Sequence, residues 1–275
     1  MTPAAKRRAV LRLREEFKMS ERRACGLIGI HRATHQYRSR RKDDSELRER
    51  MLAIARERPR FGYRRVHIML RREGFAVNHK RVYRLYRLEG LAVRKRKRKR
   101  ISTTQRVPHP LPQRPNQRWS MDFVSDGLGS GRRFRTLNVV DDFSRECLAI
   151  EVDFSLPGAR VARVLDEVIA VRGKPEGITI DNGPEFAGND LDKWAYANGI
   201  ELRFITPGKP IENAFIESFN GRFRDECLNQ HWFLSLKHAR RLISAWKEDY
   251  NTVRPHTALG NVPPAEFVRR QKGAA

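Results

Sequence analysis

The sequence predicts an α/β domain with a mixed sheet, preceded by a basic all-helical region. Two observations lead to this prediction. The chain has 275 residues and a formal charge of +25, and the excess lies at one end: residues 1–117 contain 35 Lys and Arg against 10 Asp and Glu, whereas residues 118–275 contain 22 of each. After residue 118, strand-like runs alternate with helical patterns, as in a sheet covered by helices.

The first region, residues 1–41, is expected to contain three short helices between residues 6 and 41. Ser20 can cap the second helix, Gly29 can end it, and a basic third helix runs from about His31 to Arg38. The apolar stripe of the first helix consists of Val10, Leu11, Leu13 and Phe17. This order is typical of a helix-turn-helix, whose third helix could present to a DNA groove the side chains of Arg32, Thr34, His35 and Arg38. A plain three-helix packing unit would produce nearly the same pattern.

A second basic helical region spans residues 42–92. Helices are predicted at 44–57, 63–73 and 79–88, with Asn78 as a cap and with Gly62 and Gly74 as breaks. The expected small core consists of Ile68, Leu70, Phe75, Val82, Tyr83, Leu85 and Tyr86.

Residues 93–117 are expected to form a linker. Its basic run is Arg94, Lys95, Arg96, Lys97, Arg98, Lys99 and Arg100, and the prolines that follow are Pro108, Pro110, Pro112 and Pro115. Adjacent like charges repel each other and prolines favour an extended chain. The run could also lie along a DNA backbone, and a merely solvated spacer is the alternative.

Residues 118–275 carry the pattern of the α/β domain. Strands are predicted at 118–124, 134–140, 147–152, 178–181 and 201–205. Helices are predicted at 158–172, 186–198, 211–229 and 236–250.

The composition indicates which binding partners and which cellular compartment to expect. Nucleic acid is the leading partner, because Lys and Arg that neutralise phosphates gain affinity from released counterions. An anionic membrane surface is the rival, but no stretch approaches the roughly 20 apolar residues of a membrane span. Cys25, Cys147 and Cys227 are far apart and predict neither a disulfide framework nor a zinc site. His31 and His35 stand one helical turn apart, but we interpret them as solvated positions rather than metal ligands. We expect a protein of the cytoplasm.

Asp122 is the first candidate for chemistry. Phosphodiester reactions need charge stabilisation that two metal ions can supply, and hard cations such as magnesium prefer carboxylate oxygens. Asp122 lies inside the strand-like run 119–124, where Asp is disfavoured. The alternative is a hydrogen-bonded core Asp. Asp141 and Asp142 are rivals that fit a turn between two hairpin strands.

Two further carboxylates lie where an α/β sheet binds ligands. Asp181 ends a predicted strand, although Asp before Asn182-Gly183 is also an ordinary turn residue. Glu217 lies on a predicted helix, and at 100° per residue it shares a polar stripe with Asn213, Asn220, Gly221 and Arg224. A solvated face is the alternative, but Gly and Asn are poor choices for one.

These residues carry a family resemblance. Asp122, Asp181 and Glu217, with 35 residues between the last two, resemble the DDE motif of retroviral integrases and bacterial insertion-sequence transposases. The surrounding sequence motifs are similar to those of the catalytic OrfB-type proteins of insertion sequences whose overlapping orfA and orfB frames make a fused transposase. These motifs are residues 119–123, 139–145, 181–186 and 213–221, together with 62–65, 78–82 and Asn251, Arg254, Pro255 and His256.

The resemblance implies an RNase H-like domain over residues 118–275 with its carboxyl-terminal segment. It implies that Asp122, Asp181 and Glu217 are both catalytic residues and metal ligands, with two Mg²⁺ (or Mn²⁺) ions. DNA contacts are expected from Arg224, Arg222, Asn213 and Asn220, from Arg94 to Arg100, and from Arg32, His35 and Arg38.

The implied function is metal-dependent strand cleavage and strand transfer on double-stranded DNA, at transposon ends and target. The expected partners are an orfA-encoded protein or fusion and further copies of the chain on DNA, in a bacterial cytoplasm and associated with the nucleoid. A nuclease that only hydrolyses DNA is one alternative. A non-enzymatic DNA-binding regulator is the other.

Overall fold

The computed structural model describes residues 1–37, 44–91, 93, 111–181, 183, 189–206 and 213–272. The chain divides into two compact units, Met1–Arg48 and Glu49–Ala275. In the described part of the chain, no helix combines the length and the apolar character that a membrane span requires.

The first unit contains the predicted helices α1 (Pro3–Phe17), α2 (Glu21–Ile28) and α3 (Arg32–Gln36). Ser20 caps α2 by accepting the N–H of Arg23, and Gly29 ends it in the left-handed region, as expected. The core of this unit is small and consists of Val10, Ala24, Cys25 and Ile30. The predicted stripe was too wide, because Leu11 and Phe17 are exposed. Two short helices cover only the side of α1 that carries Val10 and Leu13.

The helices that follow α3 are α4 (Ser45–Glu57), α5 (Tyr63–Arg72) and α6 (His79–Leu88), as predicted. Asn78 caps α6 by accepting the N–H of Lys80 over 2.9 Å. The buried side chains are Leu47, Met51, Ile54, Ala55, Phe61, Val66, Leu70, Val77, Val82, Leu85 and Tyr86. Tyr83 was wrongly placed in this core, because it is 43% exposed.

A five-stranded mixed sheet forms the centre of the second unit. Its strands are β1 (Arg118–Gly127), β2 (Arg133–Asp141), β3 (Cys147–Asp153), β4 (Gly177–Ile180) and β5 (Glu201–Phe204), in the order β3-β2-β1-β4-β5. β1, β2 and β3 are antiparallel neighbours, and β4 and β5 run parallel to β1. All five predicted strands are present. β1 is the central strand, so neighbouring strands flank it on both sides and its side chains lie inside the domain.

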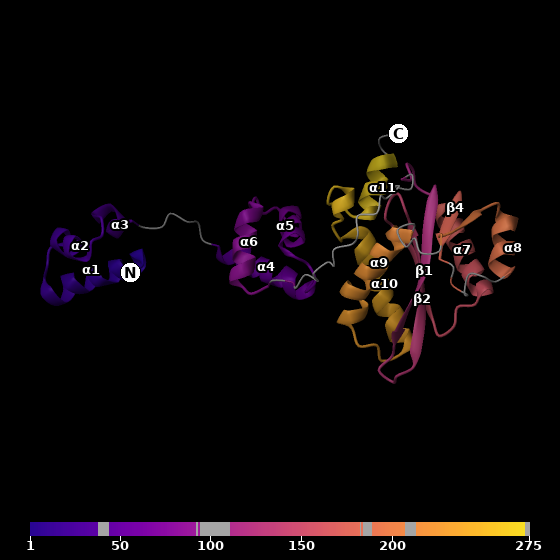
Figure 1. Cartoon of the computed structure of the whole chain (residues 1–275), viewed down its shortest axis with the longest axis horizontal. Coiled ribbons are helices and arrows are strands. Elements are labelled where there is room, and N and C mark those ends of the chain that lie inside the picture. The colour runs from indigo at the N-terminus through magenta and orange to yellow at the C-terminus, as the bar shows by residue number, and fades with distance from the viewer. Residues whose placement is uncertain are drawn as a thin grey trace. The chain divides into compact units, whose positions relative to one another are not determined.

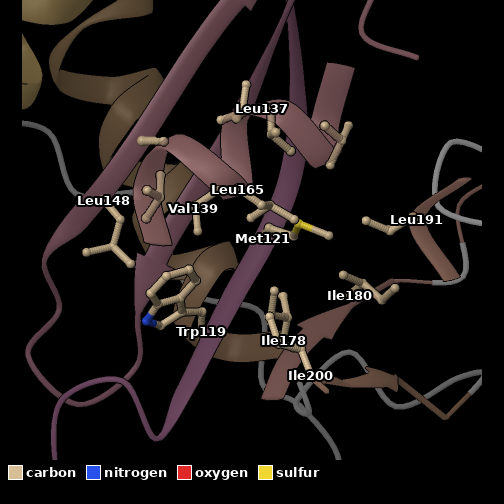
Figure 2. Close-up of a cluster of buried hydrophobic side chains, with 14 of the residues drawn as sticks. Trp119, Met121, Leu137, Val139, Leu148, Leu165, Ile178, Ile180, Leu191 and Ile200 are labelled. Atoms are coloured by element: carbon tan, nitrogen blue, oxygen red, sulfur yellow. The ribbon is translucent and has the colours of Figure 1, made fainter. Parts of the chain in front are cut away.

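Helices cover both faces of this sheet (Figure 1). α7 (Gly158–Arg172) and α8 (Asn189–Asn198) lie on one side, and α9 (Ala214–Glu226) and α10 (Leu236–Thr252) lie on the other. The first interface is the cluster drawn in Figure 2, in which Trp119, Met121, Ile178 and Ile180 meet Leu165 of α7. Side chains alternate along β1, so Val124 contributes to the second cluster, which α9 and α10 complete. Asp122 therefore belongs to the face that α9 covers.

The carboxyl-terminal segment is fastened to this second face. It contains the short turns η2 (Leu228–Gln230) and η3 (Thr257–Leu259) and the helix α11 (Pro264–Lys272), which the periodicity did not predict. The side-chain amide of Asn251 exchanges two 2.9 Å hydrogen bonds with the backbone of Cys147. Arg254 forms a two-point ion pair with Glu226 at the end of α9. His256 forms a hydrogen bond with the carbonyl of Tyr250. Asn251, Arg254 and His256, which belong to the motif that resembles the family, thus all have partners within the protein.

Candidate active site

Asp122 lies directly opposite Asn138 in the pairing of β1 with β2. Its carboxylate is half-buried. Oδ1 accepts the backbone N–H of Phe123 over 2.7 Å, and Oδ2 accepts the side-chain N–H of Asn220 over 2.7 Å. Asn220 comes from α9, so a helix and a strand together orient this carboxylate.

Asn138 holds the other end of the Asn220 amide. Its Nδ2 donates to Oδ1 of Asn220 over 2.7 Å, and its side chain is fully buried. Because Oδ1 of Asn220 accepts from Asn138, the Nδ2 of Asn220 is directed at Asp122. The Oδ1 atom of Asn138 is buried and has no hydrogen-bond partner in the part of the chain that the structure describes. Leaving a buried acceptor unpaired is costly, which marks this position as more than packing.

Asp181 is brought beside Asp122 by the parallel pairing of β1 with β4. Ser120 is the register partner of Thr179, and each aspartate lies two residues further along its own strand direction. A step of two residues keeps both aspartates on the same face of the sheet. Oδ1 of Asp181 accepts the backbone N–H of Gly183 over 3.1 Å.

Glu217 lies in the first turn of α9 and is exposed. The helix is anchored on the sheet by Ile216, Phe219 and Phe223, which are buried. Glu217 and Asn220 are three residues apart and therefore neighbours on the helix surface. The apolar side of α9 thus fixes the depth at which Glu217 approaches the two aspartates.

The three carboxylates influence one another electrostatically. Burial is the main cause that raises the pKa of Asp122 to about 6, and the charges of Asp181 and Glu217 add to it. The hydrogen bonds from Phe123 and Asn220 act in the opposite direction. Desolvation also raises the pKa of Glu217. The ionised forms of Asp122 and Glu217 are therefore destabilised in this site.

The arrangement is not a preassembled ligand cage. Among the described residues, no three His, Cys, Asp or Glu side chains are close enough to hold a metal ion as they stand. The donor chemistry nevertheless fits a hard divalent cation, because all three groups offer carboxylate oxygens and repel one another without a cation. Asp122, Asp181 and Glu217 are thus the carboxylates here that could hold such an ion.

The rival aspartates have structural partners instead. Asp141 ends β2 and accepts hydrogen bonds from Asn116, Phe143 and Ser144 in the turn that leads to β3. Asp142 is paired with Arg118 over 2.7 Å. Both lie in the hairpin turn that the sequence predicted for them. Asn116 belongs to the segment expected to be a linker, and here it packs against the sheet domain.

Family comparisons agree with this geometry. Two models described as integrase core domain match residues 112–210 and 198–264, and a model described as HTH-like domain matches residues 42–100. The chain is 50% identical over 264 residues to the uncharacterized 31.7 kDa protein of insertion element IS407 from Burkholderia multivorans (strain ATCC 17616 / 249), with 96% of this chain and 95% of that protein covered. It is 28% identical over 249 residues to transposase InsD for insertion element IS2A/D/F/H/I/K of Escherichia coli, with 85% and 82% covered. The chain belongs to the insertion-sequence transposases of the integrase superfamily.

Two further similarities extend over most of the chain. It is 46% identical over 268 residues to the uncharacterized 39.2 kDa protein of insertion element IS476 from Xanthomonas euvesicatoria, with 97% of this chain and 78% of that protein covered. The cryo-EM structure of the simian T-cell lymphotropic virus intasome in complex with PP2A regulatory subunit B56 gamma matches with a TM-score of 0.52 and 16% identity, covering 79% of this chain and 74% of that one. The second similarity concerns the fold, which is RNase H-like.

The residues predicted to contact DNA occupy several environments in the transposase. Arg222 and Arg224 are exposed on α9, and Arg224 reaches the carbonyl of Ser125 at 3.5 Å. Asn220 and Asn213 are buried, and the amide of Asn220 is hydrogen-bonded to Asp122. DNA contact by these two residues stays a prediction.

The other predicted DNA contacts lie in the amino-terminal part. Arg32 pairs with Glu21 over 3.3 Å, and His35 is half-buried. Arg38 and the basic run 94–100 lie outside the described residues. Their predicted roles also stay predictions.

Sequence reasoning missed Asn138. Its signal was present, since an amide inside the apolar strand run 137–140 is as unexpected as the aspartate inside β1. That signal becomes specific only with the strand register, which places Asn138 opposite Asp122.

Proposed function

We propose that this transposase cuts DNA strands at the ends of its insertion sequence and joins the freed 3′ ends to target DNA, using Asp122, Asp181 and Glu217 as its catalytic carboxylates. One observation carries the proposal: the Asp122 carboxylate is half-buried, is oriented by Asn220, and has its pKa raised to about 6 by burial and by the other two acids. Keeping the ionised Asp122 carboxylate half-buried beside two other acids is costly unless a cation joins them.

Divalent metal ions are the expected cofactor, and we propose two ions of Mg²⁺ or Mn²⁺. When bound, such ions would supply charge stabilisation to the attacking and leaving oxygens of a phosphodiester. Asp122, Asp181 and Glu217 would hold them.

The residues around the triad position it and the DNA. Asn138 and Asn220 set the orientation of Asp122. The buried apolar side of α9 holds Glu217 at a fixed distance from the sheet. Arg222 and Arg224 are exposed on α9, where a guanidinium can bind a phosphate oxygen. The reaction needs no covalent intermediate with the protein, since water and a 3′-hydroxyl are the successive attacking groups.

The same proposal includes the assembly. The substrate is double-stranded DNA in a bacterial cytoplasm, at the nucleoid. Further copies of the chain act together on that DNA, and an orfA-encoded protein or fusion contributes to recognition of the element's ends. Residues 1–41 and 42–92 act as DNA-binding helical regions, and 93–117 as a linker.

The test supplies Mg²⁺ and labelled duplex DNA from the element's ends, with and without the orfA protein, and looks for cut and joined strands. Asp122→Asn, Asp181→Asn and Glu217→Gln should each abolish cutting and joining while DNA binding survives. Asp126→Asn is a matched control, because Asp126 is also a β1 carboxylate and its Oδ1 accepts the backbone N–H of Gly127. Substantial metal-dependent activity in any of the three variants would refute the assignment.

A further inference from the structure

The turn between β2 and β3 contains an arginine with an unusual backbone conformation. Arg145 has a φ of 61°, in the left-handed region that few residues other than glycine adopt. Its N–H donates to the carbonyl of Asp141 over 2.9 Å, and its side chain is half-buried. The guanidinium carbon lies 3.8 Å from the centre of the Phe215 ring. Strained residues of this kind concentrate at functional sites, so the contact between Arg145 and Phe215 needs an explanation.

The turn is tied to the strand that carries Asp122. Asp142, in the same turn, accepts the hydroxyl of Ser120 over 2.7 Å and the guanidinium of Arg118 over 2.7 Å, and both donors belong to β1. Burial lowers the pKa of Arg145, and the charge of Asp142 acts in the opposite direction. The position of Arg145 is therefore fixed relative to β1.

The ring under Arg145 belongs to the helix that carries Glu217. Phe215 is the second residue of α9, is half-buried, and precedes Glu217 by two positions. The guanidinium of Arg118 also lies near this ring, 5.8 Å from its centre. A guanidinium over an aromatic ring is a favourable contact, and more so where both groups are partly desolvated. The contact is separate from the apolar anchor of Ile216, which points about 100° away around the helix.

Glu217 lies between two attachments of α9 to the sheet. On one side of it Phe215 contacts Arg145, and on the other side Asn220 donates to Asp122 over 2.7 Å. Because these two points are more than one helical turn apart, together they limit both the rotation and the tilt of the helix. The side chain of Glu217 is itself exposed, so its position is determined by the helix that carries it.

We propose that Arg145 is a positioning residue for Glu217: by stacking on Phe215 it holds the first turn of α9 in the place where Glu217 acts together with Asp122 and Asp181. The inference rests on the proposed function, because it takes Glu217 to be a catalytic carboxylate. Such a hold matters because a misplacement of a catalytic group by about 1 Å can lower a rate about 100-fold.

Two variants remove the stack, one from each side. Arg145→Met and Phe215→Leu should each lower the kcat of strand cleavage by about 10–100-fold and leave KM within about threefold of wild type. Because the two residues act through one contact, the double variant should be within about threefold of the slower single variant. Phe215→Tyr keeps an aromatic ring under the guanidinium and should retain most of the wild-type kcat.

A second stack of the same kind provides the matched control. The guanidinium of Arg132 lies 3.5 Å from the centre of the Phe154 ring. Arg132 directly precedes β2 and Arg145 follows it, so the two stacks lie at opposite ends of this strand. Arg132→Met and Phe154→Leu should lower the thermal midpoint about as much as Arg145→Met and Phe215→Leu do. They should keep kcat within about threefold of wild type, because their effect is independent of the distant site.

Hydrogen exchange of the full-length, metal-free protein measures the hold on α9 without catalysis. The amides of residues 218–220 report on it, because in an α-helix they bond to the carbonyls of the first turn. Their exchange should become about tenfold faster in Arg145→Met and in Phe215→Leu, since a helix end that loses a contact opens more often. In Arg132→Met it should match wild type. Circular dichroism verifies that each variant is folded.

The outcomes separate this inference from the proposed function. Unchanged exchange at residues 218–220 in Arg145→Met would overturn the positioning role, as would a loss of kcat that Arg132→Met and Phe154→Leu share. Faster exchange with a wild-type kcat would also overturn it. If wild type cuts no DNA with metal, the proposed function fails. Faster exchange in Arg145→Met would then still show that the stack holds the helix of Glu217.

Discussion

The Nδ2 of Asn220 donates to Oδ2 of Asp122 over 2.7 Å, and the Oδ1 of the same amide accepts from Asn138 over 2.7 Å. The amide is thereby held in one orientation at both ends. A rotated amide would face the Asp122 carboxylate with an oxygen, which would repel it. The orientation of Asp122, a candidate metal ligand, thus depends on Asn138, its partner in β2, through the amide of Asn220.

Asn138→Leu should lower the turnover of strand cleavage by about 10–100-fold with little change in KM, because a small misplacement of a catalytic group has an effect of this size. It should also cost about 1–3 kcal/mol of stability, since Oδ1 of Asn220 loses its donor. Kinetics on end DNA and chemical denaturation measure the two effects. Thr136→Val, at an equally buried site of β2, is the control. Wild-type turnover in Asn138→Leu would show that Asp122 needs no such support.

Asp122→Asn should stabilise the metal-free protein at neutral pH. The folded-state pKa of Asp122 is raised from 3.8 to about 6, so folding disfavours the ionised carboxylate, and this penalty grows as pH rises from 3.8 to about 6. The variant should gain up to about 3 kcal/mol near pH 7 and little near pH 4. Thermal unfolding in a chelator measures this.

Magnesium provides the second half of that experiment. Added Mg²⁺ should raise the thermal midpoint of wild type, because a ligand that binds only the folded state stabilises it. The midpoint of Asp122→Asn should stay unchanged. An equal response of both proteins would mean that the metal binds elsewhere.

Arg224→Ala should lower kcat/KM for strand cleavage by about tenfold or more while total DNA affinity changes less than about threefold, because one guanidinium near the triad adds little to a strongly basic protein. Arg224→Lys should recover only part of the loss, since an ammonium cannot bind two phosphate oxygens in a fixed plane. Arg241→Ala, also exposed, is the control on α10. Unchanged cleavage in a folded Arg224→Ala would reassign this side chain to its contact with Ser125.

His256 should make the transposase less stable in mild acid. Burial and the nearby Arg254 lower the pKa of His256 to about 3, from 6.5. The unfolded chain therefore takes up a proton that the folded protein refuses, so stability present above about pH 6.5 is lost as pH falls. The loss from this residue between about pH 7 and pH 5 should be about 2 kcal/mol.

Denaturation at several pH values checks that slope. His256→Gln should flatten it, whereas His31→Gln, at an exposed position, should not. A slope that is the same in wild type and His256→Gln would mean that the ring is protonated in the folded protein.

The sequence determined which segments form helices and strands and which acids stand out, because both properties are local. Periodicity predicted β1 to β5 and most helices, and an aspartate inside an apolar strand marked Asp122. α11 was missed, since its residues 264–272 have only a short apolar pattern. These inferences needed no knowledge of neighbours.

Only the tertiary structure decided what Asn138, Asn220 and Tyr83 do. The predicted polar stripe placed Asn213 and Asn220 beside Glu217. In the structure Asn213 precedes α9 as its N-cap, and the rotation of the helix on the sheet turns Asn220 inward to Asp122. Strand register placed Asn138 opposite Asp122. Tyr83 looked like core by its apolar ring, yet the packing of α5 against α6 left it at the surface among arginines. Hydrogen-bond partners and exposure depend on segments far apart in the chain, and no local pattern contains them.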